Sequence, residues 1–355
     1  MKDPEYTFKK PIFSLQWHLT TACQNSCKHC YMDRSNETLS YEDCEKVVDD
    51  FQHLLTKWKA EGRVYLTGGD PLLFPYFFEI FKYLKNVLSK DTKIGILGNP
   101  ELLDEKILSM LAALKPFYYQ LSLDGLEKNH DFIRHPGSFA STLNAIKLLQ
   151  SVGIKVAIMF TVSRVNIKDL PSVVDLVAEM GIRFFDFARY APISEKDTIK
   201  SQDWLISPLE YRKTLYRIAE RYEYHKNNSS CVTAFGYKEP LWALVDWERG
   251  KLNKITSPEY RDLIIGGCNI GATALSILHD GSVLGCRRIP KTIGKVPEEK
   301  LTDIFIHSCA LNEMRDIYKI KKCNKCELLL YCRGCRAIPF SYYKDFFAPD
   351  PQCWK

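Results

Sequence analysis

The sequence predicts an α/β protein, a partial (β/α)6, TIM-like barrel followed by a cysteine-rich C-terminal module. Strand-like and helix-like segments alternate from about residue 12 to residue 205, the pattern of consecutive βαβ units and a parallel sheet. Six such strands, rather than eight, suit an open barrel. Three of the 13 cysteines cluster near the N-terminus, and eight more follow Gly267, of which seven, all but Cys309, form a C-terminal group.

The hydrophobic pattern places each element in order. The first predicted strand, 12–19, is apolar and leads into a loop that carries three cysteines. Ser40 with Asp43 forms a capping-box-like start for a helix whose apolar residues, from Val47 to Trp58, recur at helical spacing. The later predicted strands are 64–66, 93–97, 118–123, 155–162 and 184–188, and the helices between them are 76–88, 104–114, 142–152 and 170–180.

Three segments are predicted along the chain. The barrel spans 1–205, a helical bridge spans 206–262, and the cysteine-rich module spans 263–355. The bridge combines an amphipathic helix with a polar tract. In barrels and open parallel sheets, ligand-binding groups lie at the carboxyl ends of the strands. We therefore expect motifs that follow successive strands to meet at one end of the barrel.

The composition excludes several classes of protein. Hydrophobic residues make up 46% and charged residues 26% of the 355 residues, as in ordinary globular proteins. No apolar run approaches the length of a membrane span, and residues 1–6 lack the apolar core of a signal peptide. The net charge of +6 is mild, and no arginine-rich stripe suggests nucleic acid. We expect a cytoplasmic protein whose cysteines ligate metal rather than form disulfides.

The first motif is the C-x3-C-x2-C run of Cys23, Cys27 and Cys30. Four thiolates normally close an iron–sulfur cluster, so three leave one iron free to bind a ligand. Taken alone, this motif leaves a zinc knuckle or a lone structural cluster open as alternatives. With His29 before the third cysteine, the run resembles the signature of the radical S-adenosylmethionine (SAM) enzymes. The resemblance implies SAM on the open iron and a 5′-deoxyadenosyl radical that abstracts hydrogen from a C–H bond.

The second motif is the turn Gly68-Gly69-Asp70-Pro71 after the second predicted strand. Paired glycines permit close approach of the backbone to a ligand, and Asp70 adds a negative charge. The turn resembles the segment of the radical SAM family that binds the amino group of SAM, although many members have Glu at the position of Asp70.

Two further motifs follow the third and fourth predicted strands. Gly98-Asn99-Pro100 loosely resembles the Thr-Asn-Gly turn of the family, and Ser122-Leu123-Asp124-Gly125 with Arg134 resembles a pattern of one radical SAM subgroup. The resemblance implies that these residues line the SAM site and that Arg134 pairs with the SAM carboxylate, which a guanidinium fork suits. Each motif alone could be a plain turn or a surface charge, but four in order indicate a SAM site.

The C-terminal cysteines resemble the SPASM domain, an extension of radical SAM enzymes that carries auxiliary 4Fe–4S clusters. The gap between the pairs Cys323-x2-Cys326 and Cys332-x2-Cys335 is shorter than in most zinc ribbons. The resemblance implies three 4Fe–4S clusters, one that binds SAM and two auxiliary ones. The cysteines assigned to the outer auxiliary cluster are Cys323, Cys326, Cys332 and Cys353, and those assigned to the inner one are Cys268, Cys286 and Cys335.

The remaining cysteines have other assignments. The inner cluster has three assigned ligands, so either one iron is open there or Cys309 completes the set. Cys44 and Cys231 are assigned to core packing. No catalytic acid or base is identified: Asp186, Arg189 and Tyr190 follow the sixth predicted strand, where cavity and core roles both fit.

The resemblance implies a radical SAM oxidoreductase or maturase. Family members with a SPASM domain mostly modify peptides or proteins, so we expect crosslinking, oxidation or epimerisation of a ribosomal peptide. Partners would be that substrate, a flavodoxin- or ferredoxin-type electron donor and, since only 22 residues precede Cys23, a separate leader-binding protein. In sulfatase maturases an Asp follows the counterpart of Cys286, whereas Arg287-Arg288 follows here, which disfavours that activity.

Two other functions remain as alternatives. One is oxidation or decarboxylation of a small molecule or a tetrapyrrole by the same radical chemistry. The other is a zinc-bearing interaction module without enzymatic activity.

Overall fold

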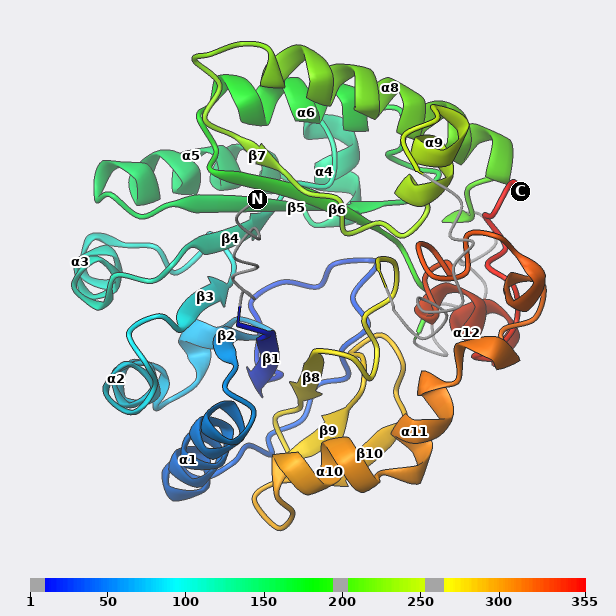
Figure 1. The fold of residues 1–355 in the computed structure, drawn as a ribbon. Coiled ribbons are helices and arrows are strands. Elements are labelled where there is room, and N and C mark those ends of the chain that lie inside the picture. Colours follow the sequence, from blue (N-terminus) through cyan, green and yellow to red (C-terminus); the bar gives the residue numbers. More distant parts are fainter. Residues whose placement is uncertain (1–9, 194–203, 253–264) are drawn as a thin grey trace, which may run out of the picture.

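The α/β prediction is confirmed by a computed structural model, which describes residues 10–193, 204–252 and 265–355. Within these ranges one sheet has the strand order β10-β9-β8-β1-β2-β3-β4-β5-β6-β7. The sheet is strongly curved and helices cover its outer face (Figure 1). The predicted boundary between residues 262 and 263, and the start at residues 1–6, lie outside the described residues.

The barrel strands pair in parallel and in chain order. All six predicted strands are present, with small shifts at their ends. The second begins three residues before the predicted one because Glu61 pairs with Ile12 of the first strand. The strands are β1 Ile12–Thr20, β2 Glu61–Gly68, β3 Lys93–Leu97, β4 Tyr119–Ser122, β5 Val156–Val162 and β6 Phe184–Arg189.

The helices between these strands begin where the sequence places capping groups. The Ser40 hydroxyl accepts a hydrogen bond from the Asp43 amide at 3.1 Å, and Asp104 caps the third helix in the same way. These caps satisfy amides at the helix N-terminus that have no intrahelical partner. The helices are α1 Tyr41–Lys57, α2 Phe77–Val87, α3 Glu105–Leu114, α4 Glu127–Ile133, α5 Ser138–Ser151 and α6 Leu170–Glu179.

Helix α4 is absent from the sequence prediction. Its seven residues are mostly polar and show no apolar periodicity. A tertiary contact holds it instead, since the Nδ1 atom of buried His130 accepts a hydrogen bond from the Asp124 amide at 3.0 Å.

The two faces of β1 have different environments. Phe13, Leu15 and Trp17 are buried, and the Phe13 ring lies 5.3 Å from that of Trp58, in the loop after α1. Since successive strand side chains alternate between faces, Gln16 and His18 point into the barrel. The helix layer is therefore packed with apolar side chains, while the inner face carries polar ones.

The bridge and the C-terminal module add strands to both edges of the barrel sheet. In the bridge, β7 (Ala234–Phe235) follows α8 (Pro208–Lys226), precedes α9 (Trp242–Glu248) and pairs with β6. At the other edge β8 (Ala274–Ile277) pairs in parallel with β1. The sequence did not predict these pairings. The remaining elements are β9 Ser282–Leu284, β10 Thr292–Lys295, α10 Leu301–His307, α11 Cys309–Arg315, α12 Ala337–Tyr343 and the short turns η1 Pro71–Leu73, η4 Ile317–Lys319 and η5 Cys323–Lys325.

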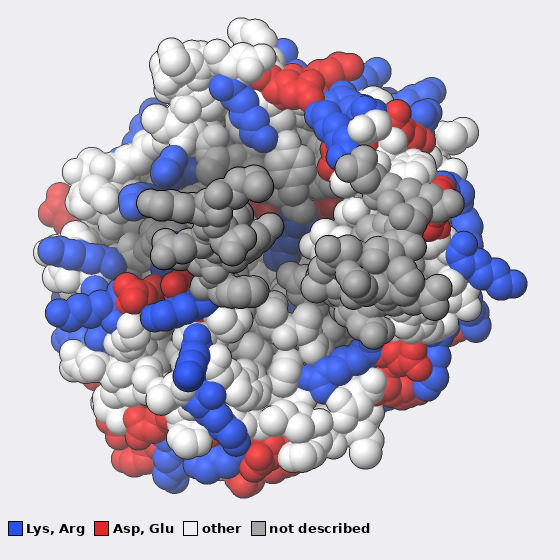
Figure 2. Space-filling model, viewed as in Figure 1, with Lys and Arg blue, Asp and Glu red and all other residues white. Residues whose placement is uncertain are grey.

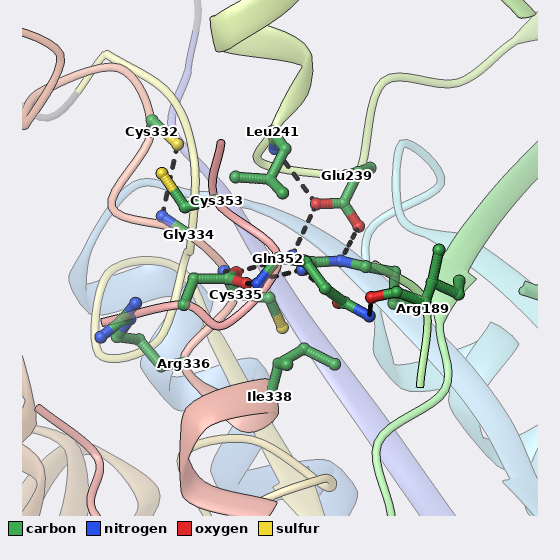
Figure 3. Close-up of polar contacts among 12 residues, drawn as sticks. Arg189, Glu239, Leu241, Cys332, Gly334, Cys335, Arg336, Ile338, Gln352 and Cys353 are labelled. Atoms are coloured by element: carbon green, nitrogen blue, oxygen red, sulfur yellow. Dashed lines mark hydrogen bonds and ion pairs between the residues drawn. The ribbon is translucent and has the colours of Figure 1, made fainter. Parts of the chain in front are cut away.

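A buried ionic network fastens the end of β6 to the C-terminus. Arg189, which is 2% exposed, donates to Glu239 at 2.9 and 3.0 Å, to Asp350 at 2.7 and 2.8 Å, and to Gln352. Asp350 in turn accepts a hydrogen bond from the Cys335 amide at 3.0 Å (Figure 3). Arg189 is thus structural, which settles one of the roles left open above.

None of the helices in the described ranges combines the length and the apolar character that a bilayer-spanning helix needs.

Substitution Arg189→Met should strongly destabilise the protein. It leaves two buried carboxylates, Glu239 and Asp350, without their cation, and breaking such a pair costs about 3–5 kcal/mol. The midpoint of urea unfolding of the reconstituted protein measures the loss. The control Arg249→Ala removes an ion pair with the exposed Glu223, worth about 1 kcal/mol or less. Equal losses in the two variants would contradict a structural role for the buried network.

Candidate functional site

The first three cysteines lie on a loop that begins where β1 ends, and the turn after β2 holds this loop in place. The Gly69 amide donates to the Thr20 carbonyl at 2.9 Å, and the Asp70 amide donates to the Ala22 carbonyl at 2.8 Å. A Cβ atom on Gly69 would overlap the Ala22 carbonyl oxygen, and one on Gly68 would overlap that of Thr20. The paired glycines therefore permit contact between two backbone segments.

Polar groups point at the sulfur atoms of this loop. The Asn99 side-chain amide donates to the Cys23 sulfur and to the Gly69 carbonyl, each at 3.3 Å. The Arg134 guanidinium lies 3.8 Å from the Cys27 sulfur. Burial raises the pKa of Cys27 to about 11 despite the Arg134 charge, and the charges of Cys30 and Cys23 raise it further. Among the described residues no three Cys, His, Asp or Glu side chains are arranged as a metal site, so a cluster shared by these three thiols stays a prediction.

Asp70 supplies a buried acceptor beside this loop. One carboxylate oxygen accepts from the Leu72 amide at 3.1 Å and caps η1, which begins at Pro71. The other oxygen is buried and makes no hydrogen bond of normal geometry among the described residues, although the Gln24 side chain lies near enough to lower the Asp70 pKa slightly. Burial raises the pKa of Asp70 to about 6. Buried polar atoms of this kind are rare in folded proteins, and a cation such as the SAM ammonium group would satisfy this one.

Asp124 and Arg134 form a buried ion pair next to His29. Arg134 donates to one Asp124 oxygen through Nε at 2.8 Å and through Nη2 at 2.7 Å. Burial lowers the pKa of His29 to about 4, although Asp124 opposes this shift, so the ring is neutral. Two of the Arg134 donors are thus engaged within the protein. Contact of Arg134, Asp124 or Ser122 (at the end of β4) with SAM stays a prediction.

The C-terminal thiols separate into two groups. Burial and then the neighbouring Cys335 raise the pKa of Cys268, and Cys286 adds to this effect. In the other group, burial and the charges of Cys353 and Cys323 raise the pKa of Cys332. Figure 3 shows Cys332 and Cys353 close to one another and Cys335 apart from them. Which cysteines hold the inner and the outer cluster stays a prediction. Cys309 is exposed at the start of α11.

Positive side chains surround the inner thiols. Arg288 donates to the Cys335 sulfur at 3.2 Å and to the Arg189 carbonyl at 3.0 Å. Lys238 is exposed to water, yet burial and the Arg288 charge lower its pKa. Figure 2 shows a hollow near the centre of the viewed face, with blue and red atoms of charged side chains inside it.

Tyr31 links the segments that carry the two sets of cysteines. It follows Cys30 directly, and the guanidinium carbon of Arg287, which follows Cys286, lies 4.6 Å from its ring centroid. Burial raises the pKa of Tyr31, and the Arg287 charge opposes this shift. The contact brings the segment of the predicted SAM-binding cysteines to that of a predicted inner auxiliary cysteine.

Asp186 is the acidic group of β6 that faces the barrel interior. Its carboxylate accepts from the Phe187 amide at 2.8 Å, and a Cβ atom on Gly236 would overlap it. Burial raises the pKa of Asp186 to about 6, while Lys238 lowers it. Tyr190, also left open above, packs against Trp204 instead, with ring centroids 5.2 Å apart.

Sequence reasoning missed several polar residues of this region: His18, Tyr31 and Lys238. Single residues on a strand or in a loop carry no motif. The only signal available for Tyr31 and Arg287 was their position next to a predicted cysteine ligand.

Comparisons with known proteins agree with the motifs. The model of the radical SAM superfamily matches residues 17–177, and that of the SPASM iron–sulfur cluster-binding domain matches residues 268–327. The chain is 26% identical to the AdoMet-dependent heme synthase of Methanosarcina barkeri over 344 residues, covering 96% of the chain and 95% of that protein. These matches favour an enzyme over the zinc-bearing interaction module and imply SAM and 4Fe–4S clusters.

Two further relatives concern peptides. The subtilosin biosynthesis protein AlbA of Bacillus subtilis is 25% identical over 342 residues, covering 92% of this chain and 68% of AlbA. The structure of Streptococcus suis SuiB bound to its precursor peptide SuiA superposes with a TM-score of 0.74 at 20% identity, covering 98% of this chain and 76% of SuiB. The SuiB likeness shows a shared fold.

Substitution Gly69→Ala should empty the first cysteine loop of iron. The added Cβ overlaps the Ala22 carbonyl oxygen and pushes the loop away from β2. Iron content after anaerobic reconstitution should fall from about 12 to about 8 atoms per chain, as expected for the loss of one of three cubane clusters. In the control Gly153→Ala, the new Cβ meets nothing within 4 Å, so iron content should stay unchanged. Full iron content in Gly69→Ala would contradict the role of the turn.

Substitution Asp186→Asn should stabilise the protein more at pH 7.5 than at pH 5.0. The folded pKa of about 6 lies above the unfolded value of about 4, so the folded state binds the proton more tightly. The wild type therefore loses stability as pH rises from about 4 to about 6 and stays at the lower level above that. The difference in urea midpoint between variant and wild type reports this, with the exposed Asp91→Asn as control. A pH-independent difference would argue against a raised pKa.

Proposed function

Since the chain is a radical SAM enzyme with a C-terminal SPASM domain, we propose that it abstracts a hydrogen atom from a C–H bond of a substrate held between its two facing sets of cysteines. The observation that carries this proposal is the contact between Tyr31, which follows Cys30, and Arg287, which follows Cys286. The guanidinium carbon lies 4.6 Å from the Tyr31 ring centroid. A substrate in this space is next to the site of radical formation and next to an auxiliary site that can take up an electron.

Bound SAM and its iron–sulfur cluster supply a 5′-deoxyadenosyl radical. For this chain we propose three 4Fe–4S clusters, with Cys23, Cys27 and Cys30 as ligands of the SAM-binding one. The unpartnered oxygen of Asp70 is suited to the ammonium group of SAM, because a buried carboxylate needs a cation or a donor. Asn99 and Arg134 are placed to donate to sulfur atoms of the first set and so stabilise their negative charge.

A ribosomal peptide is the proposed substrate. The relative AlbA serves subtilosin biosynthesis, and the sheet offers a place for a peptide backbone. In the described part of the chain β7 pairs only with β6. Val232 and Tyr237, close to β7 in sequence, are each more than half exposed. An extended peptide can add a strand to such an edge through backbone hydrogen bonds.

A tetrapyrrole is the second candidate substrate. The heme synthase relative matches nearly the full length of both chains. Lys238 and Arg288, which lie near Cys286 and Cys335, suit the propionate groups of such a molecule.

The partners proposed with this function are a flavodoxin- or ferredoxin-type electron donor and a separate leader-binding protein. The proposed location is the cytoplasm.

A groove beside the first cysteine loop suits the electron donor. It has a volume of about 810 Å³ and is lined by Lys28, Lys128, Phe132 and Arg134, among others. Lys28 lies 3.4 Å from the Phe132 ring centroid. Exposed lysines next to Cys27 would attract an acidic electron carrier.

Anaerobically reconstituted protein with dithionite and SAM should release 5′-deoxyadenosine, and Cys30→Ala should abolish this release because the first cluster loses a ligand. Precursor peptides of a neighbouring gene and iron coproporphyrin III are then supplied in separate reactions. Mass spectrometry should find a crosslink or an oxidation in the peptide, or loss of carbon dioxide from the tetrapyrrole. Chiral amino-acid analysis of the hydrolysed peptide should find an inversion, which leaves the mass unchanged.

Each outcome decides one part of the proposal. Release of 5′-deoxyadenosine by Cys30→Ala at the wild-type rate, or none by wild type, would refute the radical mechanism. Turnover of the tetrapyrrole alone would replace the peptide by the second candidate.

A further inference from the structure

A group of polar side chains around Tyr31 is not used by the function proposed above. It consists of His18 from the inner face of β1, Tyr31 from the first cysteine loop, and Arg287, which directly follows Cys286. These residues come from distant parts of the sequence: Arg287 stacks on the Tyr31 ring, and its charge acts on His18. Their hydrogen-bonding groups are incompletely satisfied.

His18 is buried without a hydrogen-bond partner for either ring nitrogen. It is 1% exposed, and both Nδ1 and Nε2 lack a partner among the described residues. Leaving a buried polar group unsatisfied costs about 1–3 kcal/mol. Burial, together with the charges of Arg287 and His279, lowers its pKa well below the usual value. A neutral imidazole offers one donor and one acceptor, and both are unused here.

Arg287 carries a positive charge that no described carboxylate neutralises. Its guanidinium lies over the Tyr31 ring, with the central carbon 4.6 Å from the ring centroid. Its Nε atom is buried and has no hydrogen-bond partner within the described ranges. The other arginines of the site differ, since Arg134 pairs with Asp124 and Arg288 donates to the Cys335 sulfur. Arg287 thus stacks on Tyr31 while its buried Nε has no partner there.

Arg287 contacts Tyr31 directly, and besides burial its charge lowers the pKa of His18. An anion placed among the three residues would gain charge-assisted hydrogen bonds from the guanidinium fork and a further hydrogen bond from His18. Among common anions a carboxylate matches the planar guanidinium best.

We propose that His18, Tyr31 and Arg287 form a carboxylate-binding subsite that anchors the substrate between the two sets of cysteines. The subsite deepens the proposed function and rests on it, because a substrate must enter this space. Its ligand is a carboxylate next to the reacting carbon. That group is the side chain of an acidic residue if the substrate is a peptide, and a propionate if it is a tetrapyrrole.

The test compares carboxylates with their neutral analogues by binding to the anaerobically reconstituted holoenzyme. One pair of probes is coproporphyrin III and its methyl ester, followed by the shift of the porphyrin absorption band. The other pair is N-acetyl-Gly-Glu-Gly-amide and its Gln counterpart, followed by tyrosine and tryptophan fluorescence. For at least one pair, wild type should bind the acid about tenfold more tightly than the neutral analogue, which corresponds to about 1.4 kcal/mol. The pair that discriminates identifies the source of the carboxylate.

Substitution Arg287→Gln should weaken binding of the acid about tenfold and leave that of the neutral analogue unchanged. Arg287→Lys should retain part of the preference, because charge remains while the planar fork is lost. His18→Asn offers a second variant that leaves the residues next to Cys286 intact. The matched control is Lys291→Gln, which removes an exposed positive charge of the same segment and should leave binding unchanged.

Iron content, the electron paramagnetic resonance signal and substrate-free release of 5′-deoxyadenosine are measured on every protein. Loss of 5′-deoxyadenosine in wild type refutes the proposed function itself. Equal binding of acid and neutral probes by a wild type that cleaves SAM overturns the subsite alone. An altered resonance signal in Arg287→Gln with unchanged acid preference would mean that Arg287 neutralises a cluster, and this also overturns the subsite.

Discussion

The parallel pairing of β1 with β8 is the interaction on which the arrangement of the site depends. Residues 14–17 of β1 pair with residues 274–277 of β8, while the other edge of β1 pairs with β2. The end of β1 carries the first cysteine loop, the end of β2 carries the glycine turn, and β8 leads through β9 to Cys286. A single central strand thus fixes the two sets of cysteines relative to each other.

Buried charges in this protein serve two purposes. Arg189 with Glu239 and Asp350, and Arg134 with Asp124, are satisfied ion pairs that hold distant segments together. Breaking them would leave buried charges without partners. His18 and Asp70 instead keep buried atoms without partners. Functional sites often contain polar groups that the fold leaves without hydrogen bonds. Here His18 lies near the end of β1 that leads into the first cysteine loop, and Asp70 lies in the turn that holds this loop.

The strands and most helices of the barrel follow from hydrophobic periodicity and capping residues. The sequence missed α4, because its polar residues are held by the contact between His130 and the Asp124 amide. It also missed β7, which has two residues and exists only as a neighbour of β6. Arg189 illustrates the same limit, since an arginine near a strand end gives no sign that its partners lie 50 and 161 residues away.

The sequence by itself determined which family the protein resembles. The cysteine spacing, the glycine turn and the order of the motifs along the strands are local patterns, and they carry the radical SAM and SPASM resemblance. Tertiary structure decided where these patterns meet. Two contacts between distant segments decide this: the pairing of β1 with β8 and the stacking of Arg287 on Tyr31. The local sequence does not predict these contacts, because each residue involved could equally face solvent or pack against another partner. They form only when the whole chain packs.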